Sequence, residues 1–145
     1  MAVNYPILLV EDNADDEVLM LHAMRGRMFD VSVTVARDGV EALEHLFAPD
    51  DQGGACMPRV VILDLKLPRI DGFDVISRLR GDPRTRPLPV VVFSSSSERE
   101  DVRRCAQLGA NSYVVKPVAA AQYKQTVWNM LRYWLDLNLA PDLRP

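Results

Sequence analysis

The sequence has few cysteines and no long apolar run. Its two cysteines, Cys56 and Cys105, lie far apart and lack the close spacing of metal ligands, so we expect both to be reduced thiols. No apolar stretch approaches the roughly 18 residues that a membrane-spanning helix needs, and the N-terminus has no basic segment. These absences predict a cytoplasmic protein without a membrane anchor.

The sequence also lacks an excess of basic residues, because it contains 17 Lys and Arg but 20 Asp and Glu. The net charge of -3 argues against general binding of nucleic acid. The apolar fraction of 48% is ordinary for a soluble globular protein. With 145 residues we expect a single domain over 1–145 and no separate output domain, with an extended C-terminal helix and tail from about 119 to 145.

Five short apolar segments alternate along the chain with segments of helical periodicity. The expected strands are Ile7–Val10, Val31–Val35, Val60–Leu63, Val90–Phe93 and Tyr113–Val115. Such alternation predicts an α/β protein with a parallel sheet, right-handed crossovers and helices on both faces. A segment rich in Pro, Gly and Asp, Ala48–Arg59, is expected to form a surface loop longer than the connection requires.

Polar residues follow four of these strands, and parallel strands place their carboxyl ends along one edge of the sheet. They are Glu11 and Asp12 after the first strand, Asp64 after the third, Ser94 after the fourth and Lys116 after the fifth. Clustered carboxylates repel one another unless a cation joins them, and an all-oxygen ligand set favours Mg²⁺. A carboxylate can also attack a phosphoryl group, while a metal, a lysine and a hydroxyl offset the charge on its oxygens.

Several motifs in this order resemble those of the two-component response-regulator receiver domain, over nearly the entire chain. They are Leu9–Asn13, Val61–Pro68, Asp71–Gly72 and Tyr113–Pro117. The resemblance implies a flavodoxin-like (βα)5 fold with strand order 2-1-3-4-5. It also implies a phosphorylated signalling switch rather than a turnover enzyme, with Mg²⁺ as the cofactor.

The resemblance assigns roles to individual residues. Asp64 would be the phosphoacceptor, and Lys116 would contact the phosphoryl group. Mg²⁺ would be bound by Glu11, Asp12, Asp64 and the backbone carbonyl of Lys66. The switch would be formed by Ser94 and Tyr113. The Lys116–Pro117 bond matches a position that is cis in the family. The bland alternative for Tyr113 is a strand residue that packs as core with its hydroxyl at the surface.

Two positions near the phosphoacceptor leave alternatives open. Many receivers carry Asn where this chain has Lys66, which could place a second cation beside the phosphate or lie in solvent. We predict that Lys66 alters the lifetime of the phosphoryl group, in a direction that the sequence does not give. Ser96 lies where the family often tunes hydrolysis, although the simpler interpretation is that Ser95–Ser97 form a flexible polar loop.

Other polar residues near the motifs are expected to serve the fold. Asp15, Asp16, Asp71 and Asp74 suit helix starts and are left out of the site, and Asn13 suits a cap or an indirect metal contact. The basic group Arg99, Arg103 and Arg104 is expected to be a solvated helix face that a kinase or target could still use.

The C-terminal helix carries more apolar residues than one buried face can hold. Tyr123, Val127, Met130, Leu131 and Trp134 have core-like spacing, whereas Trp128, Leu135, Leu137 and Leu139 cannot all share that face. We therefore expect a homodimer through this helix and the tail Ala140–Pro145. The alternative is a tail that folds back on its own domain.

Within the receivers, the chain is similar to the short single-domain regulators associated with phytochrome-type histidine kinases. The shared features are the insertion before the third strand, the serine run after the fourth strand and the long last helix. The expected partners are therefore such a kinase and a downstream target or phosphotransfer protein.

A competing class is a phosphatase or phosphotransferase that forms an aspartyl phosphate during turnover. Haloacid-dehalogenase-like enzymes of this class need an acid two residues after the nucleophile, where this chain has Lys66. A flavodoxin-like cofactor carrier would need a phosphate-binding loop after the first strand, where this chain has Glu11 and Asp12. Both alternatives conflict with residues of the motifs.

Overall fold

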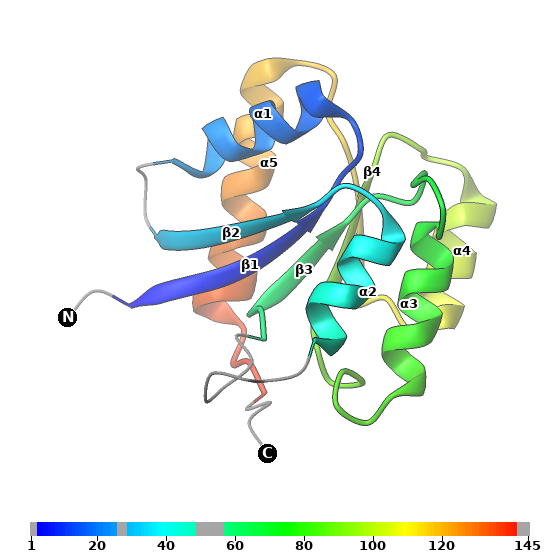
Figure 1. Ribbon diagram of the computed structural model, residues 1–145. Coiled ribbons are helices and arrows are strands. Elements are labelled where there is room, and N and C mark those ends of the chain that lie inside the picture. Colours follow the sequence, from blue (N-terminus) through cyan, green and yellow to red (C-terminus); the bar gives the residue numbers. More distant parts are fainter. Residues whose placement is uncertain (1–2, 26–28, 49–56, 142–145) are drawn as a thin grey trace.

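The protein is built on a five-stranded parallel sheet with the order β2-β1-β3-β4-β5 (Figure 1). The computed structural model describes residues 3–25, 29–48 and 57–141. Its elements are β1 (Asn4–Val10), α1 (Ala14–Met24), β2 (Asp30–Ala36), α2 (Gly39–Phe47), β3 (Val60–Leu63), α3 (Gly72–Gly81), β4 (Val90–Ser94), α4 (Arg99–Leu108), β5 (Ser112–Val115), α5 (Ala120–Leu131) and a π-helical end, η1 (Arg132–Leu137). This order and the parallel pairing confirm the predicted flavodoxin-like architecture.

The sheet is buried on both sides, because successive residues of a strand point to opposite faces. In β3, Val61 and Leu63 pack on the side of α2, α3 and α4, whereas Val60 and Ile62 pack on the side of α1 and α5. Figure 1 shows α1 and α5 on one face of the sheet and α2, α3 and α4 on the other. All four β3 residues are buried, which explains the unbroken apolar run of this strand.

Three of the helices have a short polar side chain as the cap at their N-terminus. The side chain of Asn13 accepts hydrogen bonds at the start of α1, Asp38 does so for α2 and Asp71 for α3. These bonds satisfy backbone N–H groups that have no partner in the first helical turn. Asn13 and Asp71 are therefore caps, as their positions in the sequence predicted.

The C-terminal segment buries more of its apolar residues than the sequence indicated. The indole Nε1 of Trp128 donates a 2.7 Å hydrogen bond to the carbonyl of Ala23 in α1. Helix α5 widens into the π-helix η1, in which Leu135 is buried and Trp134 packs against the same core cluster. A π-turn adds a residue to the helical turn and rotates the following side chains. Leu135 therefore does not add to an exposed patch, contrary to the expectation from the sequence, whereas Trp128 is half-buried.

Some sequence predictions concern residues outside the described ranges. Cys56, most of the loop before β3 and residues 142–145 of the tail lie there. Cys105 is a buried thiol without a disulfide. Among the described helices, none combines the length and apolarity needed to cross a bilayer.

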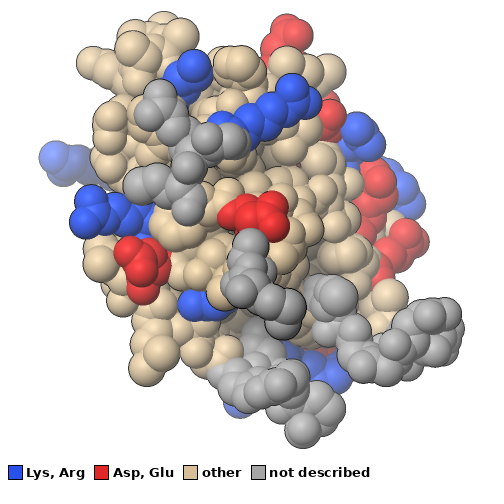
Figure 2. Space-filling view, turned by 90° about the vertical axis from the view of Figure 1, so that its left-hand side faces the viewer, with Lys and Arg blue, Asp and Glu red and all other residues tan. Residues whose placement is uncertain are grey.

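Charge is dispersed on the face of the molecule shown in Figure 2. Basic and acidic side chains are interspersed there and separated by uncharged surface. An extended stripe of one sign, as used for nucleic-acid backbones, is not visible on this face.

Candidate functional site

Adjacent strands carry the polar residues of the site to one edge of the sheet. The amide of Asp64 donates to the carbonyl of Val10 over 3.0 Å, which extends the pairing of β1 and β3 up to the carboxylate. The amide of Lys116 donates to the carbonyl of Ser94 over 2.8 Å and extends the pairing of β4 and β5 in the same way. The strand ends thus hold these residues in fixed register, as the sequence predicted.

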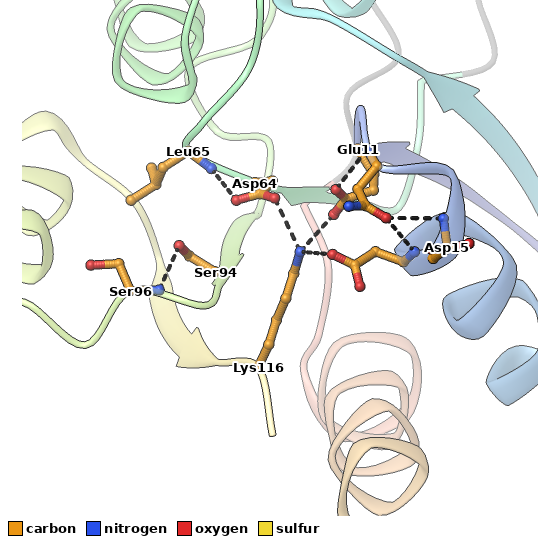
Figure 3. A network of polar contacts seen from close by, with 9 residues as sticks. Glu11, Asp15, Asp64, Leu65, Ser94, Ser96 and Lys116 are labelled. Carbon is orange, nitrogen blue, oxygen red and sulfur yellow. Dashed lines mark hydrogen bonds and ion pairs between the residues drawn. The ribbon is translucent and has the colours of Figure 1, made fainter. Parts of the chain in front are cut away.

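The ammonium of Lys116 lies at the centre of the site (Figure 3). Its Nζ is 2.8 Å from Oε2 of Glu11, 2.9 Å from Oδ2 of Asp16 and 3.0 Å from Oδ2 of Asp64. The lysine side chain is only 8% exposed. Three carboxylates therefore surround one nearly buried cation.

Asp16 belongs to this site, so the prediction that it only serves the start of α1 is wrong. Its carboxylate comes from the first turn of the helix and contacts Lys116. Helical spacing gave no signal for this contact, because Asp12 precedes the N-cap Asn13 and lies outside α1. Asp15, Asp71 and Asp74 remain in helix starts.

The acidic trio of Glu11, Asp12 and Asp64 has the geometry of a cation site. Each residue offers a carboxylate oxygen, and these atoms lie within 4.8 Å of one another. A purely oxygen ligand set suits a hard divalent cation. The trio therefore fits the metal that the sequence predicted. Its members Asp12 and Asp64 border a cleft of about 550 Å³ that Lys66 and Ser95 also line.

Burial shapes the protonation of the site. Burial raises the pKa of Glu11 to about 7, and the nearby Asp64 adds to this effect, while the hydrogen bond from Lys116 opposes it. Burial works against the charge of Lys116, but its bonds to Glu11 and Asp16 and the charge of Asp64 together raise the pKa of the lysine. Lys116 is therefore a permanent cation, whereas Glu11 can hold a proton near neutral pH.

The loop after Asp64 turns sharply to bring the carboxylate into the cleft. Oδ1 of Asp64 accepts a 2.7 Å hydrogen bond from the amide of Leu65, and the carbonyl of Leu65 accepts one of 2.9 Å from Gly72. A Cβ atom at position 72 would lie 2.5 Å from the carbonyl oxygen of Asp64. The Asp71–Gly72 pair is thus a capping residue followed by a position where the backbone leaves no room for a side chain.

The loop between β4 and α4 connects Ser94, Ser96 and Tyr113 by hydrogen bonds. Figure 3 shows Ser94 and Ser96 on the opposite side of Asp64 from Glu11. The amide of Ser96 donates to Oγ of Ser94 over 3.2 Å. The Ser96 hydroxyl donates to Asp101 over 2.6 Å and accepts from the amide of Glu98 over 3.2 Å. These bonds favour an ordered loop, and the predicted effect of Ser96 on hydrolysis stays a prediction.

Two other expectations near the site have different outcomes. The side chain of Lys66 is exposed and lines the cleft, while the role of its carbonyl as a metal ligand stays a prediction. The bond between Lys116 and Pro117 is trans, since no cis peptide occurs in the described ranges, so the prediction of a cis bond is wrong. Trans is the intrinsically favoured isomer, and Lys116 reaches the carboxylates from this backbone.

The basic residues of α4 lie on its outer surface, as expected. Arg103 pairs with Glu100 three residues earlier, and both side chains are more than half exposed. The guanidinium of Arg104 lies 4.0 Å from the ring centre of Phe73 in α3. Exposed pairs of this kind contribute little to stability, which leaves the solvated-face interpretation in place.

The model of the response regulator receiver domain family matches residues 7–127. The chain belongs to this family. This membership favours a signalling switch over the alternative of a small-molecule phosphatase. Family members include proteins in which the receiver is fused to an enzyme, such as a protein-glutamate methylesterase of Anaeromyxobacter dehalogenans, of which this chain covers 29%.

Three relatives are close to this chain in length. The chain is 39% identical over 135 residues to the probable methanogenesis regulatory protein FilR2 of Methanothrix harundinacea, covering 93% of this chain and 86% of FilR2. It is 32% identical to the phosphorylated cyanobacterial phytochrome response regulator RcpA, with a TM-score of 0.89, covering 97% of this chain and all of RcpA. It is 28% identical to the Mn²⁺-bound form of Rcp1 of Synechocystis, with a TM-score of 0.86, covering 95% of this chain and 99% of Rcp1.

Proposed function

We propose that Asp64 accepts a phosphoryl group from a phosphohistidine of a histidine kinase. An oxygen of Asp64 forms the new bond to phosphorus, and the phosphorus–nitrogen bond breaks as the imidazole leaves with its electron pair. The observation that carries this proposal is the carboxylate of Asp64, which belongs to the acidic trio and lies 3.0 Å from Lys116 at an open cleft.

The other residues of the site divide the supporting roles. Glu11, Asp12 and Asp64 would hold Mg²⁺, which when bound neutralises charge on the phosphoryl oxygens. Lys116 supplies a second, permanent positive charge to the same oxygens. Ser94 and Tyr113 report the phosphoryl group to the surface, because both are tied to Ser96 in the loop before α4.

The kinase that we propose is of the phytochrome type. The support is the close structural likeness to RcpA and Rcp1 over nearly the full length of each. FilR2, named as a probable methanogenesis regulatory protein, is more similar in sequence, so the cognate kinase needs a direct test of phosphotransfer. The downstream partner would be a target protein or a phosphotransfer protein.

We also propose a homodimer through the C-terminal segment. Tyr133, Leu137 and Leu139 are 50%, 64% and 94% exposed, and all three lie in or just after η1 at the end of the last helix. Large apolar side chains grouped in this way are typical of interaction surfaces.

The decisive experiment is phosphorylation with acetyl phosphate and Mg²⁺, followed by intact mass spectrometry. The wild type is expected to gain one phosphoryl group, and Asp64→Asn is expected to gain none. A chelator should abolish the adduct on the wild type. An adduct on both proteins would show that Asp64 is not the acceptor.

A further inference from the structure

Among the residues that the structure describes, Asp16 is the one ion-pair partner of Lys116 outside the acidic trio. A lysine ammonium has three N–H donors, and here they face oxygens of Glu11, Asp16 and Asp64 at 2.8, 2.9 and 3.0 Å. Glu11 and Asp64 belong to the trio that fits a cation, whereas Asp16 does not. The three bonds of the lysine therefore respond differently when a cation binds.

A divalent cation held by the trio would compete with Lys116 for Glu11 and Asp64. It would draw the negative charge of both carboxylates towards itself and would repel the ammonium. Because the side chain of Lys116 is only 8% exposed, an unpaired ammonium there would be poorly solvated. Asp16 lies outside the trio and stays available as a hydrogen-bond acceptor for the lysine.

The backbone holds Asp16 firmly in the position that this requires. The amides of Asp15 and Asp16 donate to Oδ1 of Asn13 over 2.9 and 3.0 Å, which fixes the first turn of α1. From that turn the carboxylate of Asp16, 35% exposed, reaches Lys116 across the end of the sheet. Asp15 makes no ion pair among the described residues, although it borders the same cleft.

We infer that Asp16 is a positioning residue that holds the Lys116 ammonium beside Asp64 while the acidic trio binds its cation. This inference rests on the proposed function of Asp64 and Lys116. Without Asp16, the ammonium turns towards solvent, and the incoming phosphoryl group loses a counter-charge. Asp16 acts on the reaction only through Lys116.

The test compares Asp16→Asn with the matched control Asp15→Asn, which removes the same charge from the same helical turn. Acetyl phosphate is the donor, so the bond from phosphorus to the acetate oxygen breaks as the bond to Asp64 forms. At saturating Mg²⁺ we expect Asp16→Asn to be phosphorylated roughly three- to tenfold more slowly, since a charge-assisted bond at a partly exposed group is lost. Asp15→Asn should stay within about twofold of the wild type.

Two further measurements separate positioning of Lys116 from a general effect of charge. With Mg²⁺ present and no phosphoryl donor, acetic anhydride should acylate Lys116 faster in Asp16→Asn than in Asp15→Asn, as measured by peptide mass spectrometry. In a Lys116→Ala background, Asp16→Asn should have no further effect on phosphorylation. Asp16→Ala is measured in parallel, so that the conclusion does not depend on the correct folding of one variant.

The inference is overturned if Asp16→Asn and Asp15→Asn behave alike, or if the effect of Asp16→Asn persists in Lys116→Ala. Failure of the proposed function has a different signature. It would appear as a wild type without an adduct, or as an adduct on Asp64→Asn, and in either case before any variant of Asp16 is considered.

Discussion

The phenol of Tyr113 donates a 2.8 Å hydrogen bond to the backbone carbonyl of Ser96. The amide of the same serine donates to Oγ of Ser94, which is 1% exposed. One residue of the loop therefore connects the buried hydroxyl beside Asp64 to an aromatic ring near the surface. A movement of Ser94 towards a phosphoryl group would strain both bonds.

This connection predicts that the environment of Tyr113 changes on phosphorylation. With ring-labelled tyrosine, the NMR signal of Tyr113 should shift when acetyl phosphate and Mg²⁺ are added. Ser94→Ala should remove the shift even though Asp64 is phosphorylated, because the hydroxyl that pulls on Ser96 is absent. Tyr5, at the start of β1 and so at the opposite end of that strand from the site, is an internal control, and an equal shift in Ser94→Ala would contradict the coupling.

The exposed Lys66 at the cleft predicts an altered phosphoryl lifetime in Lys66→Asn. A cation at the cleft can either shield the phosphoryl group from water or assist its hydrolysis, so the prediction is a changed decay rate of either sign. Decay is followed by intact mass after the donor is removed. Lys124→Asn, which removes a lysine of α5, should decay like the wild type, and equal rates in Lys66→Asn would refute the prediction.

The raised pKa of Glu11 predicts pH-dependent metal binding. Because burial raises this pKa to about 7, a proton on Glu11 must leave before Mg²⁺ binds below that pH. Calorimetric titration should show affinity for Mg²⁺ rising roughly tenfold from pH 6 to pH 8, with release of a proton. Glu11→Gln should bind more weakly at pH 8 and show a flatter dependence on pH.

The same shift predicts how the metal-free fold responds to pH. The folded-state pKa of Glu11 lies above the ordinary value of 4.5, so the folded state binds the extra proton between these values. The contribution of this group to stability is present below about pH 4.5 and is lost as the pH rises through about 7. The free energy of unfolding of Glu11→Gln, measured in urea, should lack this pH-dependent contribution. A pH profile identical to that of the wild type would argue against it.

Two glycines form a matched pair for testing how closely α2 approaches the loop after Asp64. A Cβ at Gly39 would lie 2.0 Å from the carbonyl oxygen of Ile70, so Gly39→Ala is expected to lower the free energy of unfolding by roughly 2 kcal/mol or more. A Cβ added at Gly81, at the end of α3, would meet no neighbouring described residue within 4 Å. Gly81→Ala should be neutral or stabilise by up to about 1 kcal/mol, as measured by urea unfolding.

The exposed leucines of the C-terminal segment predict a dimer that charge would disrupt. Size-exclusion chromatography with light scattering should give a dimeric mass for the wild type at micromolar concentration. The double variant Leu137→Glu and Leu139→Glu should be monomeric. Val18→Glu, at a residue of α1 that is 65% exposed, is the control and should remain dimeric. A monomeric wild type, with and without phosphorylation, would refute the dimer.

The sequence by itself determined the elements and the main residues of the site. Apolar runs such as Val60–Leu63 mark buried strands, and each polar residue that follows a parallel strand must lie at the same edge of the sheet. That rule is enough to bring Glu11, Asp64 and Lys116 together, as the ion pairs confirm. The strand order came from the family resemblance, because the periodicity of a strand does not specify its neighbour.

Only the tertiary structure decided which other side chains point into the site and which surfaces stay exposed. Asp16 looked like a helix-start residue, yet the docking of α1 on the sheet directs its carboxylate to Lys116. Leu135 looked surplus to the buried face of the last helix, yet the π-turn rotates it into the core. Both outcomes depend on the rotation of a helix about its axis, which is set by long-range packing rather than by local sequence.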